Sequence, residues 1–159
     1  MCGIAGYLGK TTHPYSCLNE MARAIKHRGP DDTGTWFDED GDIGLAHARL
    51  SILDLSSAGH QPMHAISNNF VLVFNGEIYN HKILRFELDS INPRNWLGHS
   101  DTETLLAAID YWGLEKTLKK AKGMFAIALW DKRNKILSLA IDRIGEKPLY
   151  FGWVSNQFV

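Results

Sequence analysis

The chain has 159 residues, 45% hydrophobic and 22% charged, and a formal net charge of -1 from 17 Lys and Arg against 18 Asp and Glu. This length and composition are typical of one soluble globular domain, and they exclude a disordered chain, a collagen and a disulfide scaffold. The balanced charge lacks the basic excess that binds nucleic acid or anionic membranes, so we expect small molecules or other proteins as partners.

No stretch of the sequence approaches the roughly 20 apolar residues of a membrane helix, so no membrane contact is expected. The first basic residue is Lys10, and the N-terminal apolar segment therefore lacks the preceding positive charge of a signal peptide. These features predict a cytoplasmic protein. In that compartment Cys2 and Cys17 are expected to be free thiols rather than a structural disulfide.

Hydrophobic spacing predicts short strands and amphipathic helices. In chain order the sequence predicts a strand at 3–8, a helix around 18–25, weaker strands at 35–38 and 43–49, a strand at 70–74, a short helix at 82–88, a helix at 105–112, a short helix at 114–121, strands at 125–130 and 136–141, and a weaker strand at 149–153. The strong strands do not alternate between apolar and polar residues, which predicts cover on both faces. Because the strands come in groups, we expect an α+β fold with stacked antiparallel sheets and helices outside them.

Cys2 is the first candidate catalytic residue, because it follows the initiator methionine and opens an apolar strand. If Met1 is removed, one residue carries both a thiol and a free α-amine. The reference pKa values are about 8.5 for the thiol and about 7.7–8.0 for the amine. The amine can then act as a base near neutral pH and activate the thiol as a nucleophile.

A series of short motifs begins at Cys2 and continues along the chain. They are Cys-Gly-Ile-Ala-Gly at 2–6, His-Arg-Gly-Pro-Asp-Asp-Thr-Gly at 27–34, His-Ala-Arg-Leu-Ser-Ile-Leu-Asp at 47–54, Gln-Pro-Met at 61–63, Asn-Gly-Glu-Ile-Tyr-Asn at 75–80, Ser-Asp-Thr-Glu at 100–103, Gly-Met-Phe-Ala at 123–126 and Asp-Arg-Ile-Gly-Glu-Lys-Pro-Leu-Tyr at 142–150. Each motif alone is weak, but the ordered series resembles the glutaminase domain of class II glutamine amidotransferases. The Gly-Pro-Asp-Asp segment resembles the glutamine-hydrolysing asparagine synthetases in particular.

The resemblance runs from residue 2 to about residue 152. It implies the four-layer αββα sandwich of the N-terminal-nucleophile hydrolases, with residues 1–159 forming one glutaminase domain. It also implies hydrolysis of L-glutamine to glutamate and ammonia, with Cys2 as the nucleophile.

Seven further residues are candidates for binding glutamine and its transition state. The Arg49 guanidinium can hold the substrate α-carboxylate through two parallel hydrogen bonds, and the resemblance adds backbone groups of Leu50 and Ile52. Asn75-Gly76 is a strong hairpin signal, and the Asn amide and Gly N–H can also form an oxyanion hole. The resemblance implies that oxyanion role.

By the same resemblance, Glu77 and Asp101 accept hydrogen bonds from the substrate α-ammonium. Asp101 also has a local interpretation, since Ser100 and Glu103 form a Ser-x-x-Glu capping box in which Asp101 is a first-turn acid. Arg28 is expected to order the loop near the nucleophile, and the turn at 145–148 is expected to be structural. The histidines show no ligand spacing and Cys-x-x-Cys is absent, so no metal is expected.

Asparagine synthetases carry a second, C-terminal domain that uses ATP and Mg to amidate aspartate, and its Ser-Gly-Gly-x-Asp-Ser loop does not occur in this sequence. We therefore expect no cofactor for this domain, and a synthetase domain as its partner in the full-length protein. Two alternatives stay open: an amidotransferase domain serving a sugar or secondary-metabolite acceptor, and a non-catalytic binding module if Met1 is retained.

Overall fold

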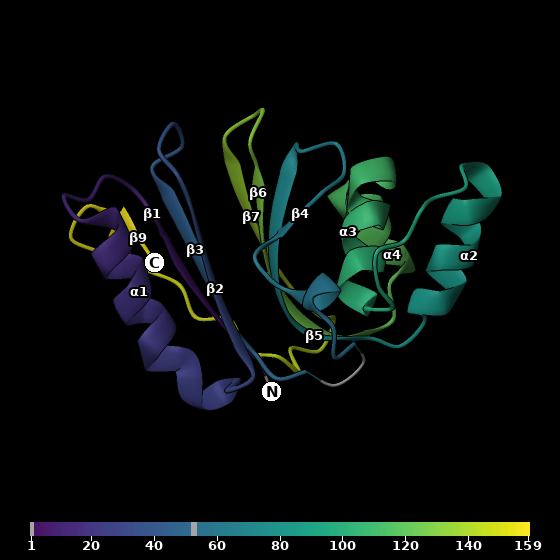
Figure 1. Ribbon diagram of the computed structural model, residues 1–159. Helices are drawn as coiled ribbons and strands as arrows, with labels where there is room; N and C mark the ends of the chain where they lie inside the picture. The colour runs from purple at the N-terminus through teal and green to yellow at the C-terminus, as the bar shows by residue number, and fades with distance from the viewer. Residues whose placement is uncertain (1, 52–53) are drawn as a thin grey trace.

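The computed structural model describes residues 2–51 and 54–159, in which two antiparallel sheets stack face to face (Figure 1). The first sheet has the strand order β2-β3-β1-β9-β8 and the second has the order β4-β5-β6-β7. The strands are β1 Gly3–Leu8, β2 Asp32–Asp38, β3 Ile43–Arg49, β4 Met63–His64, β5 Phe70–Ile78, β6 Gly123–Asp131, β7 Ile136–Ile141, β8 Trp153–Val154 and β9 Gln157–Phe158. The helices are α1 Pro14–Ile25, α2 His81–Ile91, α3 Asp101–Trp112 and α4 Leu114–Lys120.

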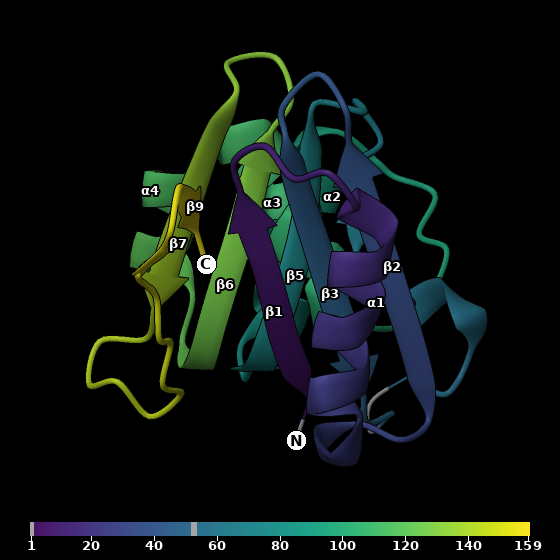
Figure 2. The same cartoon turned by 90° about the vertical axis from the view of Figure 1, so that its left-hand side faces the viewer.

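Helices cover the outer face of each sheet. Helix α1 lies against the first sheet, α3 and α4 lie on the far side of the second, and α2 packs against α3 (Figures 1 and 2). The expected four-layer αββα sandwich is therefore confirmed. None of the helices within residues 2–51 and 54–159 combines the length and apolarity needed to cross a bilayer.

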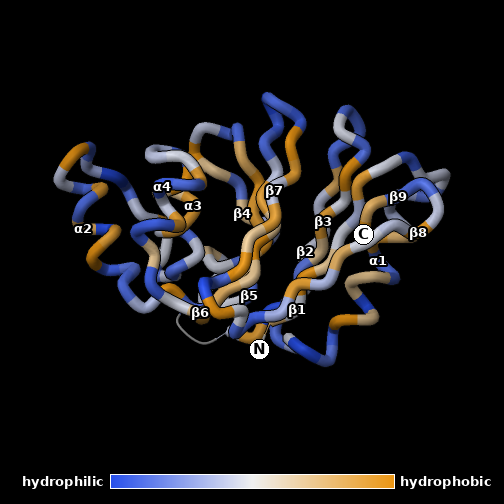
Figure 3. Tube along the Cα trace, turned by 180° about the vertical axis from the view of Figure 1, so that it is seen from behind, coloured by the Kyte–Doolittle hydropathy of each residue, from blue (hydrophilic) through white to orange (hydrophobic). Residues whose placement is uncertain are grey.

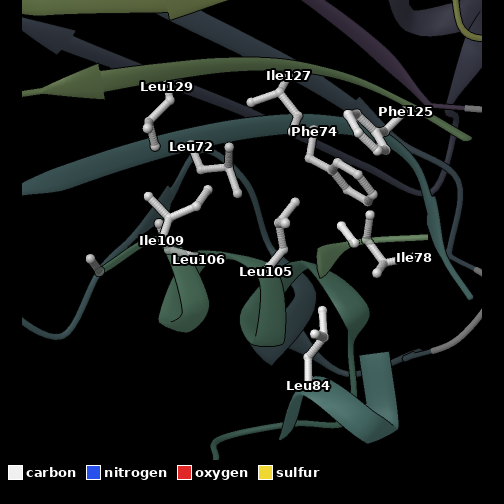
Figure 4. Packing of buried hydrophobic residues seen from close by; sticks show 12 residues of the cluster. Leu72, Phe74, Ile78, Leu84, Leu105, Leu106, Ile109, Phe125, Ile127 and Leu129 are labelled. Carbon is white, nitrogen blue, oxygen red and sulfur yellow. The ribbon is translucent and has the colours of Figure 1, made fainter. Parts of the chain in front are cut away.

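Successive side chains of a strand point to opposite faces of its sheet. A strand that is covered on both faces therefore supplies apolar side chains to two cores. On β5, Leu72 and Phe74 belong to the core beneath α3, where they meet Leu105 (Figure 4). Val71 and Val73 belong to a second core, between the two sheets. Figure 3 shows the resulting hydrophobic colour along the central strands.

The same alternation brings polar residues together at one end of the inter-sheet space. On β3, His47 and Arg49 continue the face that carries Leu45, which packs between the sheets. On β5, Asn75 and Glu77 continue the face of Val71 and Val73. The sheets approach each other at the end of the molecule where the N-terminus lies (Figures 1 and 3).

Two local predictions are wrong. Asn75-Gly76 makes no hairpin, because β5 continues to Ile78 and pairs with β6 over its whole length. Only residue 153 of the strand expected at 149–153 lies in a strand, the two-residue β8; residues 149–151 have no strand partner and line the apolar edge of the inter-sheet space.

Candidate active site

A cavity of about 110 Å³ lies where the polar ends of β3 and β5 meet the start of β1. Every predicted site residue that the structure describes lines it: Cys2, Arg49, Leu50, Asn75, Gly76, Glu77 and Asp101. The remaining predicted residue, Ile52, lies outside the described residues. The structure thus brings together residues that are up to 99 positions apart in the sequence.

Backbone contacts hold the half-buried Cys2 beside the end of β3. The Leu50 N–H donates to the Cys2 sulfur at 3.4 Å, and the Leu50 carbonyl lies 3.6 Å from the same sulfur. The Arg28 guanidinium donates from Nε to the Cys2 carbonyl at 3.2 Å. The thiol is free. Arg28, at the end of the short 3-10 helix that follows α1, therefore contacts the residue that carries the thiol.

The edge of β5 beside the cavity is open, because β4 has only two residues and pairs only with Val71 and Leu72. Along an antiparallel strand, the N–H and C=O of alternate residues point to the same side. The N–H groups of Phe74 and Ile78 point away from β6 and donate to Gln61 Oε1 at 2.7 Å and Asp101 Oδ2 at 2.8 Å. The Gly76 N–H lies between them and has the same direction.

Two hydrogen-bond donors therefore line the cavity without a partner among the described residues. One is the Gly76 N–H, and the other is the side-chain amide of Asn75, which is 6% exposed. Glycine is required at position 76, because a Cβ there would lie 2.1 Å from the Met124 carbonyl oxygen. A thiol and two unpaired donors in one cavity are the components needed to attack a carbonyl and stabilise the resulting oxyanion.

Asp101 connects helix α3 to the open edge of β5. Its Oδ2 accepts the Ile78 N–H, and its Oδ1 accepts the Thr102 N–H at 3.0 Å. Burial raises the pKa of this carboxyl group, although the hydrogen bond from Ile78 acts in the opposite direction. Half-buried Glu77 lines the same cavity.

The capping box is only half formed. Ser100 Oγ accepts the Glu103 N–H at 3.1 Å, as predicted. The Glu103 carboxylate accepts the N–H groups of Leu97 at 2.7 Å and Gly98 at 3.0 Å, so it is occupied by the preceding loop rather than by Ser100.

Arg49 is buried at the end of β3 and organises the loop that follows it. Its Nη1 donates to the Ser56 carbonyl at 2.8 Å, and its Nη2 donates to the Asp54 carbonyl. Each terminal nitrogen carries a second N–H, so the guanidinium keeps donors for an incoming carboxylate. A Cβ at Gly59 would lie 2.1 Å from Nη2, so a larger residue at this position would displace the guanidinium.

Several cavity residues were not predicted as site residues. They are Asp54, Gly59, Gln61, Phe74, Ser100, Thr102, Met124 and Lys147. The Asp54 carboxylate accepts hydrogen bonds from the Ser56 hydroxyl at 2.6 Å and the His99 N–H at 2.8 Å, and these contacts lower its pKa to about 2. The motif series in the sequence could have identified them, because it includes most of these residues.

The turn at 145–148 is organised by Asp142, as its structural interpretation predicts. Burial acts to raise the pKa of Asp142, but N–H donors from Glu146, Lys147, Phe125 and Ile144 together lower it to about 2. These bonds place Lys147 at the cavity.

The described residues contain no group of three or more His, Cys, Asp and Glu that could hold a metal ion. His60 instead contacts Asp32 through Nδ1, at 2.7 Å from Oδ2.

Comparison with known proteins gives one consistent result. The model of the glutamine amidotransferase domain family matches residues 1–159. A putative glutamine-hydrolyzing asparagine synthetase 2 from Methanocaldococcus jannaschii is 37% identical, over 100% of this chain and 33% of that protein. The glutamine-hydrolyzing asparagine synthetase 1 of Bacillus subtilis is also 37% identical, over 99% of this chain and 25% of its own length. The amidase chry2 of Gibberella zeae is 36% identical, over 100% of this chain and 25% of its own.

Among solved structures, the glutamine phosphoribosylpyrophosphate amidotransferase of B. subtilis superposes with a TM-score of 0.80 at 18% sequence identity. The superposition covers 99% of this chain and 41% of the other, and it supports the fold alone. The chain spans a quarter to a third of the length of the curated relatives described above.

Proposed function

The chain belongs to the glutamine amidotransferase domain family, and we propose that it hydrolyses the side-chain amide of L-glutamine to glutamate and ammonia, with Cys2 as the nucleophile. One observation carries the proposal: the Cys2 thiol shares a cavity with two unpaired donors, the Asn75 amide and the Gly76 N–H. A carbonyl group held between them would be attacked on carbon while its oxygen accepts both hydrogen bonds.

The proposed reaction begins with Cys2 attack on the amide carbon of glutamine. The α-amine of Cys2, freed by removal of Met1, takes the thiol proton and later protonates the leaving nitrogen. Collapse of the tetrahedral intermediate breaks the C–N bond, releases ammonia and leaves a γ-glutamyl thioester. Water then hydrolyses the thioester to glutamate and restores the thiol. Met1 itself lies outside the described residues.

The α-carboxylate and the α-ammonium of glutamine, which are bonded to the same carbon, both have complementary groups in the lining of the cavity. We assign the α-carboxylate to Arg49, whose guanidinium matches it geometrically, and to backbone groups near Leu50 and Ile52. We assign the α-ammonium to Glu77 and Asp101, which line the same cavity. No cofactor takes part in this scheme.

Replacement of the nucleophile tests the proposal directly. Cys2→Ala is expected to abolish ammonia release and keep the fold, and Cys2→Ser is expected to be severely impaired, because a hydroxyl lacks the acidity of a thiol. A glutamine analogue with a diazoketone in place of the amide should label the parent protein at Cys2. Normal ammonia release by purified Cys2→Ala would refute the assignment.

For the full-length protein, we propose that the ammonia passes to a synthetase domain that amidates aspartate with ATP and Mg. The names of the relatives from M. jannaschii and B. subtilis support this acceptor. The segment around 144–154 exposes large apolar side chains, including Ile144 at 82% and Tyr150 at 89%, and such a surface is suited to packing against another domain. We also propose a cytoplasmic location, which the free thiols of Cys2 and Cys17 support.

Two alternative functions can be distinguished from this proposal by experiment. One relative is named as an amidase and not as an asparagine synthetase, so the alternative is an acceptor other than aspartate, such as a sugar or secondary metabolite. Aspartate-dependent ATP hydrolysis by the full-length protein separates these cases. A non-catalytic binding module would bind glutamine without releasing ammonia. Intact-mass measurement of Met1 content, made beside the glutaminase assay, decides that alternative.

A further inference from the structure

We propose that His47 and Gln61 are positioning residues that hold the open edge of β5, so that the Asn75 amide and the Gly76 N–H face the Cys2 thiol. Neither residue contacts the reacting atoms in the proposed reaction. The inference rests on the proposed glutamine hydrolysis, which it extends by naming what fixes the oxyanion donors.

The geometry begins with Phe74, the residue directly before the two donors. Strand β4 ends too early to pair with it, so both of its edge-facing backbone groups depend on side chains. The Phe74 N–H donates to Gln61 Oε1 at 2.7 Å, and the Phe74 carbonyl lies 3.2 Å from His47 Nε2. That carbonyl belongs to the peptide group that continues into Asn75, so a shift of Phe74 would carry both donors with it.

His47 is suited to hold this carbonyl because it is fixed in position and uncharged. It is 1% exposed and projects from β3 toward the second sheet, two residues before Arg49. A carbonyl oxygen can only accept, so Nε2 carries the proton, and buried Nδ1 has no partner among the described residues. Burial lowers the pKa of His47 to about 4, which keeps the ring neutral at physiological pH.

Gln61 connects the same edge to helix α3, which carries Asp101, the residue proposed to bind the α-ammonium. Its Nε2 lies 3.5 Å from the hydroxyl of Thr102, beside Asp101 on helix α3. Asp101 in turn accepts the Ile78 N–H. Buried side chains therefore hold the strand on both sides of Gly76, whose own N–H has no partner among the described residues.

The consequence is a separation between binding and chemistry. Arg49 and Asp101, which lie outside β5, would still contact the α-carboxylate and the α-ammonium of glutamine if Phe74 moved, but the donors would no longer meet the developing oxyanion. A misplacement of about 1 Å can cost about 10²-fold in rate. A merely structural role would lower stability and leave the rate per folded molecule unchanged.

Paired variants test the proposal. His47→Leu removes the donor to the Phe74 carbonyl, whereas His47→Gln offers an amide N–H at a similar reach. Gln61→Met removes the acceptor for the Phe74 N–H, whereas Gln61→Glu keeps one. We expect the Leu and Met variants to lose about 10- to 100-fold in kcat, with the Kd of glutamate changed less than about twofold, and the Gln and Glu variants to recover most of the loss.

An aldehyde analogue of glutamine adds a readout that stability does not affect. The Cys2 sulfur adds to the aldehyde carbon and the carbonyl oxygen takes the thiol proton, which gives a tetrahedral hemithioacetal with its oxygen beside the donors. Its affinity is expected to fall in parallel with kcat/KM. Exposed His64→Leu on β4 is the matched control for charge and size, and Ile43→Ala in the inter-sheet core controls for lost stability.

The outcomes distinguish a failure of the positioning role from a failure of the proposed glutaminase function. An active parent protein whose Leu and Met variants keep full kcat and aldehyde affinity would overturn the positioning role. A defect confined to KM, or equal losses in the Leu and Gln variants, would also overturn it. If His47→Leu does not fold, the Gln61 pair and His47→Gln carry the same test. A parent protein without glutaminase activity would instead contradict the proposed function.

Discussion

Acidification is expected to destabilise the fold through His47, which cannot take up a proton without losing its buried, neutral state. Its pKa is lowered by burial from 6.5 to about 4, with Arg49 acting in the same direction and the hydrogen bond to Phe74 acting against it. Between those values the unfolded chain binds the proton and the folded chain does not, so stability rises with pH across this window. At about 1.36 kcal/mol for each pKa unit, this difference in proton binding lowers the free energy of unfolding by about 3 kcal/mol across the whole window as the pH falls.

Urea denaturation at pH 7.5, 6, 5 and 4.5 measures this contribution when the parent protein is compared with His47→Gln, which does not titrate at this position. Between pH 6 and pH 5, the free energy of unfolding of the parent should fall by about 1 kcal/mol more than that of the variant. The carboxyl groups of Asp54 and Asp142, with pKa values of about 2, contribute at lower pH and are common to both proteins. Parallel curves for the two proteins would refute the reasoning.

Three further substitutions separate the proposed roles at the cavity. Asn75→Ala should lower kcat by about 10²–10³ with little change in glutamine affinity, since the donor acts on developing charge; a defect in affinity alone would make Asn75 a binding residue. Arg49→Lys keeps the charge but loses the planar fork, so it should weaken glutamine binding by about 1.5–3 kcal/mol, and equal turnover of an analogue without the α-carboxylate would exclude this role. Gly59→Ala places a Cβ 2.1 Å from Arg49 Nη2, so it should raise KM more than it lowers kcat; an unchanged KM would show that the guanidinium can move without cost.

The sequence is most informative where the cause of a structure is local. The ranges predicted at 3–8, 43–49 and 136–141 match β1, β3 and β7, because each is a short, largely apolar run with a turn residue at one end or both: Gly9, Asp42, Lys135 and Asp142. Ser100 caps α3 as its spacing predicts. The motif series identifies the cavity residues because most of them lie in short consecutive runs.

The sequence is least informative where partners are distant. The turn signal of Asn75-Gly76 is overridden by pairing along the whole length of β5, which no local propensity reports. His47 and Gln61 bond to Phe74 across 27 and 13 residues, and nothing in either segment indicates that the β5 edge needs them. The two-residue strands β4, β8 and β9 are too short to show a hydrophobic period.

The central claim is that the Cys2 thiol forms a covalent bond with the γ-acyl group of glutamine. Acid quenching during turnover, followed by intact-mass and peptide mass spectrometry, measures this directly. We expect a γ-glutamyl group on Cys2 in chains without Met1, and none on Cys17, on Met1-bearing chains or on Cys2→Ala. An adduct at Cys17, or full turnover by homogeneous Met1-bearing protein, would contradict the account.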